Sequence, residues 1–543
     1  MPSVKTSSKA RREAIKKNHL VFYVALFNHI THKNKRLTFK NYNYLKDVYL
    51  DESPKQVDKK STQGGISEKL LVKAMCRASI GRKVFYVLPS TVLKNAFVQE
   101  RFDLSIEFTP YYKHLTSGMS RKMVESTSLK HVGKGSIYFV GSHSPANFTS
   151  YASDYNIIDE WDSCNQENLK MAPERQSASD DPETDIVGNP TVEDFGVDAE
   201  YKKSDMKQWH VVCTHCNKLN QINFFDHVVR EEGEGDYIIR DPNYEKFSGI
   251  DCFPICEHCE RTLERYGTGY WIERKKSEVS GREHNKIFGS KVTMQFLLDR
   301  FEDGMVDQEK MQRFYNGDLG LAYTASGSKI DFKMMDDCIE DYLMPNSLPS
   351  NAVCVMGIDV GKYLHIRISQ LLPDGRLRAV YIGTIPLLDG KEIKEIKEVK
   401  NLWKLYNCKC GVVDAAPEMR LARSLCSNIK GMFRWNHGSD TKNPVDIQTK
   451  KVVYDRNVML DNVKASILSK HIILPKNART IGGLTSKGVS EYYDNMSAPT
   501  RVLEEYGREK KKRYVWRETR PDHFAFAEGY TILAKKILVS IKG

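Results

Sequence analysis

The chain has 543 residues, which is too long for a single hydrophobic core, so we expect two or three domains. Its charged fraction of 28% and apolar fraction of 40% are typical of a soluble globular protein, and its net charge of +12 suits a polyanionic partner such as nucleic acid. No apolar run is long enough to span a membrane and the N-terminus lacks a signal-peptide core, so we expect neither a membrane-spanning nor an exported protein.

A basic arm is predicted at the N-terminus, over residues 1–34. Its first 18 residues are basic and contain Lys5, Lys9, Arg11, Arg12, Lys16 and Lys17. Such a run of charge either lies in solvent or contacts phosphate groups.

A glycine-containing loop follows in residues 59–67, ahead of a helical run. Glycines let backbone N–H groups approach phosphate oxygens, and the helix N-terminus adds partial positive charge. Ile66 stands where the strict phosphate-binding pattern has lysine, so Lys60 or Lys59 would supply the cation, and Ser67 is placed to contact magnesium. A flexible loop that merely opens a helix is the alternative interpretation.

Two adjacent carboxylates end the apolar pair Ile157-Ile158. Asp159 would hold a divalent cation at the end of a buried strand, and Glu160 would align an attacking water. Apolar runs at 83–89 and 136–142 add further strands, and a Gly-Asn-Pro-Thr turn follows at 188–191. This order is typical of an α/β nucleotide-binding domain, although two acids after an apolar pair also suit a solvated strand end.

Two Cys-x-x-Cys pairs lie in the middle of the chain. They are Cys213 with Cys216, and Cys256 with Cys259. Four thiolates on two such turns suit one tetrahedral zinc ion, and the chain between them predicts a small inserted module. Cys252 is a fifth candidate, and two unrelated cysteine pairs are the alternative.

Three aspartates in the C-terminal part occupy comparable places. Asp359 and Asp414 each come at the end of an apolar strand, and Asp522 opens the last helix. Clustered acids of this kind bind the two metal ions used in phosphodiester cleavage, an arrangement that belongs to the RNase H-like fold. Ordinary strand ends and a helix N-cap are the alternative.

The ordered motifs resemble the large subunit of tailed-bacteriophage terminase, most closely its lambda-like branch, which also has a displaced lysine and a cysteine-containing segment. The resemblance implies a P-loop ATPase domain of the ASCE type with a zinc-binding insertion, followed by an RNase H-like nuclease domain. ATP and Mg²⁺ (or Mn²⁺) would be cofactors with Zn²⁺, and Glu160 would activate water. The implied nucleotide contacts are Lys60, Gln63, Gly64, Gly65, Ser67 and Asp159.

The resemblance also implies the domain limits and the biology. The ATPase motor would span 35–335 with its insertion at about 208–275, and a linker at 336–350 would lead to the nuclease at 351–543. The protein would translocate viral double-stranded DNA into the procapsid and cut concatemeric DNA. Its partners would be the small terminase subunit and the portal protein, on which it would form a ring. It would act in the bacterial host cytoplasm and be absent from the mature virion.

Two other functions remain open from the sequence. One is a nucleic-acid helicase or remodeller with a degenerate RNase H-like domain, which strand separation without cleavage would favour. The other is a zinc-bearing DNA-binding scaffold with an inactive P-loop, for which Ile66 is the best argument. A nucleotide titration without signal would favour the scaffold.

Overall fold

The computed structural model describes residues 19–117, 126–149, 151–233, 236–246, 248, 250–325, 327–387, 392–438, 445–506 and 511–542. The chain divides into two compact units, Met1–Tyr323 and Thr324–Gly543. The first 18 residues of the predicted basic arm lie outside the described ranges. Among the helices that these ranges contain, none combines the length and the apolar character needed to cross a bilayer.

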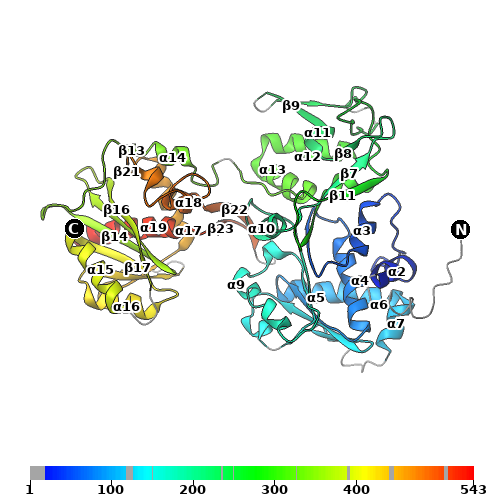
Figure 1. Cartoon of the computed structure of the whole chain (residues 1–543), viewed down its shortest axis with the longest axis horizontal. Coiled ribbons are helices and arrows are strands. Elements are labelled where there is room, and N and C mark those ends of the chain that lie inside the picture. Colours follow the sequence, from blue (N-terminus) through cyan, green and yellow to red (C-terminus); the bar gives the residue numbers. More distant parts are fainter. Residues whose placement is uncertain are drawn as a thin grey trace. The chain divides into compact units, whose positions relative to one another are not determined.

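A seven-stranded sheet forms the centre of the first unit (Figure 1). Its strands, in spatial order, are β12 (Ser280–His284), β1 (Lys55–Lys60), β6 (Glu183–Gly188), β5 (Tyr155–Ile158), β2 (Lys83–Leu88), β4 (Gly135–Gly141) and β3 (Leu129–Val132). All neighbours are parallel except β3 and β4. Strand β6 lies between β1 and β5, which is the order of ASCE-type P-loop ATPases and confirms the predicted class.

Helices cover both faces of this sheet. Helix α4 (Ile66–Ser79) packs on one face with Tyr86 and Ile157, and α10 (Gly196–Lys203) covers the other face, where its Val197 packs with Val57. Successive strand residues point to opposite faces, so β1 presents Lys60 to one helix layer and Lys59 to the other. This alternation decides which lysine lies beside the glycine-containing loop at residues 61–65, which is called the nucleotide loop below.

The cysteine module is inserted between α10 and β12. It contains a three-stranded antiparallel sheet of β11 (Gly269–Ile272), β7 (Gln208–Val212) and β8 (Leu219–Gln221), and a hairpin of β9 (Val229–Gly233) and β10 (Asp236–Ile239). The indole of Trp271 donates to the carbonyl of Tyr44 at 2.8 Å, and this contact joins the module to α3 (Tyr44–Leu50).

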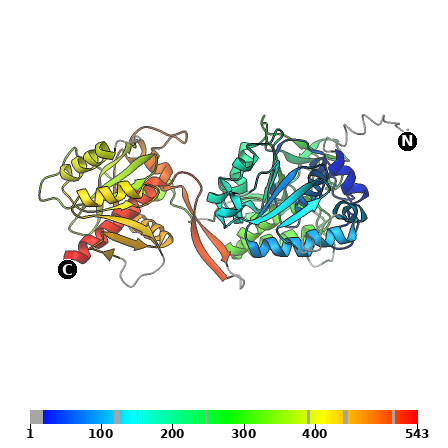
Figure 2. The ribbon, with the colours of Figure 1, turned by 90° about the horizontal axis from the view of Figure 1, so that it is seen from below.

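A nine-stranded mixed sheet forms the second unit (Figure 2). Its strands, in spatial order, are β13 (Ile339–Glu340), β21 (Ile472–Pro475), β16 (Leu377–Pro386), β15 (Tyr363–Leu371), β14 (Cys354–Val360), β17 (Cys408–Asp414), β18 (Met432–His437), β20 (Lys451–Tyr454) and β19 (Val445–Asp446). The antiparallel run β16-β15-β14, continued by parallel β17 and β18, is the RNase H-like order and confirms the prediction.

Two helical layers enclose the second sheet. Helices α15 (Glu392–Leu405) and α16 (Met419–Asn428) share one core with Met356 and Ile358 of β14. On the other face, α17 (Arg456–Leu468), α18 (Glu491–Met496) and α19 (His523–Lys542) share a core with Val355. A hairpin of β22 (Pro499–Tyr506) and β23 (Lys511–Glu518) precedes α19.

The segment predicted as a linker, 336–350, includes a strand. Within it β13 pairs in parallel with β21, and Cys338 donates its thiol hydrogen to the carbonyl of Ile467. These contacts make the segment part of the second unit, which begins at Thr324.

Candidate functional site

The nucleotide loop connects β1 to α4 through residues 61–65. Gln63 and Gly65 both have positive φ, at 61° and 85°, so the chain turns sharply before the helix begins. The Asn189 amide donates to the carbonyl of Lys60 at 2.9 Å and to that of Asn316 at 2.6 Å. The loop, the Gly-Asn-Pro-Thr turn and the segment at Asn316 therefore meet at one place.

Gly320 packs closely against the start of the loop. Its φ is 67°, and a Cβ built there would lie 2.6 Å from the backbone N of Ser61. A larger residue would push the end of β1 away, so this position requires glycine. Thr62 donates its backbone N–H to the carbonyl of Gly317 at 2.8 Å, which anchors the loop to the same segment.

The structure brings Lys60 and not Lys59 to the paired acids. The ammonium of Lys60 lies 2.8 Å from the carboxylate of Glu160. Lys59 points to the opposite face, where it contacts Glu283 at 2.7 Å and Asp198 at 3.1 Å. Ile66, at the usual lysine position, is 1% exposed and belongs to the hydrophobic core. Of the two lysines, Lys60 is thus the one that lies beside the paired acids.

Asp159 and Glu160 follow β5 directly and differ in environment. Asp159 is buried and accepts hydrogen bonds from the hydroxyls of Tyr86, at 3.1 Å, and Ser67. Its pKa is raised, mainly by burial and to a smaller extent by the negative charge of Glu160. Glu160 is 41% exposed at its side chain and has φ 57°, a strained backbone conformation of a kind that clusters at functional sites. Burial lowers the pKa of Lys60, but both carboxylates outweigh it, and the net shift is upward.

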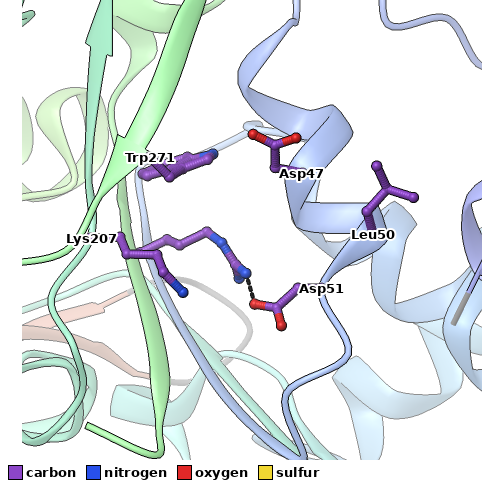
Figure 3. Close-up of a pocket in the computed structure, with 6 residues that line it drawn as sticks. Asp47, Leu50, Asp51, Lys207 and Trp271 are labelled. Atoms are coloured by element: carbon purple, nitrogen blue, oxygen red, sulfur yellow. Dashed lines mark ion pairs between the residues drawn. The ribbon is translucent and has the colours of Figure 1, made fainter. Parts of the chain in front are cut away.

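A pocket of about 270 Å³ lies elsewhere on the first unit (Figure 3). It is lined by Asp47, Leu50, Asp51, Lys207, Trp271 and Arg282. Two of the lining residues, Arg282 and Asp51, form an ion pair. Asp51 lies just before the start of β1, whereas the nucleotide loop follows the end of that strand. None of the predicted nucleotide or metal residues lines this pocket.

The four predicted cysteines come together. The Sγ atoms of Cys213 and Cys259 are 3.7 Å apart and those of Cys216 and Cys256 are 3.8 Å apart, and all four lie within 4.8 Å of one another. Tetrahedral zinc–thiolate bonds of about 2.3 Å place sulfurs about 3.8 Å apart, so the set fits zinc. Cys252 is buried outside this set, and burial raises the pKa of its thiol to about 12.

The predicted acids of the second unit also converge. Strands β14 and β17 are parallel with Ile358 opposite Val413, so Asp359 and Asp414, the next residues, lie side by side at the ends of these strands. Helix α19, which Asp522 precedes, crosses β14 closely: a Cβ on Gly357 would lie 2.0 Å from the carbonyl oxygen of Ala527. Only glycine at 357 permits this approach.

Burial, and repulsion from Asp359, act on both of the other acids. Burial raises the pKa of Asp414 to about 6, and Asp359 adds to the shift. Burial likewise raises the pKa of Asp522 to about 7, with further contributions from Glu518 and Asp359. Carboxylates held together against their charge are the oxygen donors that magnesium and manganese prefer, so the set fits divalent cations.

Two histidines that the sequence did not single out complete this centre. His523 bonds Asp359 through Nδ1 at 2.8 Å, and its ring stacks on His365 with centroids 4.4 Å apart. Donor atoms of Asp359, His365 and His523 lie within 4.8 Å of one another. His523 follows Asp522 directly and His365 pairs with Asp359 across the β14–β15 hairpin, so the hairpin register was the signal that could have found His365.

Comparison with known proteins finds a family whose model matches part of the chain. A family model described as "Phage terminase large subunit gpA, ATPase domain" matches residues 48–269. No curated protein matches the chain. Among solved structures, the large terminase of a thermophilic bacteriophage is 13% identical, with 90% of this chain and 94% of that chain covered and a TM-score of 0.29.

Two single-domain structures align with parts of the chain. The large terminase ATPase domain of Thermus phage P74-26 is 11% identical over 55% of this chain and 97% of its own, with a TM-score of 0.32. The large terminase nuclease of thermophilic phage G20c is 12% identical over 37% and 96%, with a TM-score of 0.25. Because these TM-scores are low, the alignments carry no argument about the fold, which rests on the strand orders described above. The family match, on the segment that carries the nucleotide loop and the paired acids, identifies residues 48–269 as an ATPase domain of the phage terminase large subunit family.

Proposed function

We propose that this chain is a terminase large subunit that hydrolyses ATP to drive viral double-stranded DNA into the procapsid and cuts concatemeric DNA with a metal-dependent endonuclease. The observation that carries the proposal is a pair of acid centres, one in each unit. Asp159 and Glu160 follow a parallel strand, and Asp359 and Asp414, at the ends of two parallel strands, are joined by Asp522 at the start of α19. Each centre has the residue types that its reaction needs.

In the ATPase centre each side chain has a separate task. Ser67 and Asp159 would hold magnesium, which neutralises phosphate charge when bound. Lys60, already 2.8 Å from Glu160, would contact the phosphates, and the exposed carboxylate of Glu160 would then be free to orient the attacking water. Gln63, Gly64 and Gly65 would contribute backbone N–H groups to the phosphates.

In the nuclease centre, Asp359, Asp414 and Asp522 would hold the divalent cations. These ions, when bound, supply an activated water and stabilise the leaving oxygen. Strands β14 and β17 fix two of the acids and the start of α19 fixes the third, so the donor set is held by regular structure. The imidazole of His523 orients Asp359 from the side of α19.

The cysteine module would hold one structural zinc ion. Cys213 and Cys216 belong to the turn between β7 and β8, and Cys256 and Cys259 lie in a second turn closed by the bridge between Ile255 and Thr262. Elemental analysis of the purified protein should then find one zinc per chain. A metal-free protein that keeps its fold would remove the zinc assignment.

The partners and the place of action follow from the proposed function. We expect contact with the small terminase subunit and with the portal of the procapsid, assembly into a ring during packaging, and action in the bacterial host cytoplasm and not in the mature virion. The similarity to the lambda-like branch, with its displaced lysine, belongs to the same proposal.

The decisive test is to assay one preparation of the full-length protein for both activities. Supercoiled plasmid should be cut in the presence of Mn²⁺ or Mg²⁺, and ATP should be hydrolysed faster when double-stranded DNA is added. Strand separation without cutting would instead favour a helicase. Absence of both nucleotide binding and cleavage would favour a DNA-binding scaffold.

A further inference from the structure

Arg456 lies beside the acids of the second unit and has no role in the scheme above. It is the first residue of α17, whose N-cap, Asp455, accepts the backbone N–H of Asn457 at 2.8 Å. Its guanidinium carbon lies 4.8 Å from the ring centroid of Phe526, and its Nη2 lies 3.2 Å from the carboxylate of Asp522. Both contacts are with the start of α19.

Most of the guanidinium's hydrogen-bonding capacity is unused. Within the described part of the chain, Asp522 is the only side chain that pairs with it, and its buried Nε has no hydrogen-bond partner. The side chain is 35% exposed, so the remaining donors are accessible from solvent. Arginine–carboxylate pairs are frequently bidentate, with two parallel N–H···O bonds, whereas Arg456 contacts Asp522 through Nη2.

The charge balance of the centre explains why a cation lies there. Asp359 and Glu518 add negative charge beside Asp522, and Arg456 opposes their effect on its pKa. Arg456 acts in the same direction on Tyr530, which bonds Asp414, so its charge is felt across the cluster. The guanidinium therefore serves as counter-ion to these acids, together with the imidazole of His523 beside Asp359.

We propose that Arg456 is a phosphate-binding residue of the nuclease centre that is released by metal binding. With the centre free of metal it neutralises Asp522, and once Asp522 ligates a divalent cation its fork turns to a phosphodiester of the bound DNA strand. The inference rests on the proposed nuclease function of the second unit. A planar fork can hold two phosphate oxygens at once, which a lysine ammonium cannot match, and the ring of Phe526 keeps the fork oriented.

The proposal gives two effects of opposite sign. Arg456 competes with metal for Asp522, so Arg456→Ala should bind Mn²⁺ about ten-fold more tightly than wild type, measured by electron paramagnetic resonance on the full chain without DNA. At saturating Mn²⁺ the same variant should cut plasmid with a KM raised about ten-fold or more, because a charged phosphate contact is missing. Arg456→Lys should restore the Mn²⁺ affinity but not the KM.

A matched control comes from the same unit. Arg479 also pairs with an aspartate, Asp336, and lies 5.8 Å from the ring centroid of Tyr493, but it lies outside the acid cluster. Arg479→Ala should leave both the Mn²⁺ affinity and the KM unchanged.

Weaker or unchanged Mn²⁺ binding in Arg456→Ala, or an unchanged KM at saturating Mn²⁺, would overturn the proposal and leave a structural ion pair. Failure of the nuclease function itself looks different. In that case wild type cuts no DNA, and Asp359→Asn binds Mn²⁺ as well as wild type.

Discussion

Two buried clusters of acids, one in each unit, have pKa values that are shifted in opposite directions. Beneath α4 in the first unit, Asp58 and Asp185 are fully buried, yet the pKa of each lies below its usual value, because Lys69 and other cations outweigh the effect of burial. In the second unit, burial and neighbouring acids raise the pKa of Asp414 and Asp522. Both clusters are carboxylates inside an α/β fold, so burial alone does not distinguish them.

The difference lies in how completely the charges are paired. Lys69 contacts Asp185 at 2.8 Å and Asp58 at 3.2 Å, and Lys73 contacts Asp185 at 2.7 Å. Among the described residues, Asp359, Asp414 and Asp522 have only one partly exposed arginine, Arg456, and the imidazole of His523 as cationic partners. A fully paired cluster maintains the structure, whereas acids held together without enough counter-charge mark a site that awaits cations.

The largest expected effect separates the second cluster from the ATPase. Asp359→Asn should lower plasmid cleavage at least about a hundred-fold, because one carboxylate ligand of the cations is lost. ATP hydrolysis by the same preparation should stay at the wild-type rate. Loss of both activities together would mean that the variant misfolds or that the two units are not separate in function.

The reciprocal change is Glu160→Gln in the first unit. It should lower ATP turnover by about a hundred-fold or more while ATP binding persists, because the amide cannot assist the attacking water as the carboxylate does. Turnover and fluorescent-nucleotide titration measure the two separately. Plasmid cleavage in Mn²⁺ is the internal control, and normal turnover would refute the role of Glu160.

A third change tests the paired cluster. Asp185→Asn removes the carboxylate that Lys69 and Lys73 share, leaving Lys69 with Asp58 and Lys73 with Glu183, and should lower the free energy of unfolding by about 3–5 kcal/mol. Asp522→Asn, in metal-free protein, should not destabilise, because it removes a carboxylate that its neighbours repel. Urea denaturation followed by aromatic fluorescence compares the two, and equal destabilisation would erase the contrast between the clusters.

The smallest expected effect is on pH dependence. The pKa of Asp522 rises from 3.8 to about 7 on folding, so between these values the folded protein binds more protons than the unfolded one. This group therefore makes the metal-free protein less stable as pH rises from 4 to 7, and Mn²⁺ should offset the loss. Thermal unfolding of wild type and Asp522→Asn across this range checks the sign; identical slopes would contradict it.

The sequence indicated the strands that carry the acids, but it did not indicate which other residues lie beside those acids. Asp159, Asp359 and Asp414 follow apolar strands, and such strands can be recognised from residue type alone. Strand β1 could not be recognised in this way, because four of the six residues in Lys55–Lys60 are charged. It is a central strand only because α4, α10 and β12 supply opposite charges, such as those of Lys69, Asp198 and Glu283.

The choice between Lys59 and Lys60 shows the same limit. Both lysines precede the loop, and only the face to which each residue of β1 points separates them. Arg456 was missed because it reaches Asp522 from α17, an element distant in sequence, and tertiary placement of this kind is not encoded in local patterns. His365 was missed for another reason: the register of the β14–β15 hairpin, which pairs it with Asp359, was not used.

The central claim is that acids with too little counter-charge mark the metal centre of the second unit. Anomalous diffraction from crystals of the full chain grown with Mn²⁺ tests it most directly. We predict manganese peaks beside Asp359, Asp414 and Asp522 and none among the paired charges of Asp58 and Asp185. Crystals with ordered side chains in the second unit but no peak at the three aspartates would contradict the account.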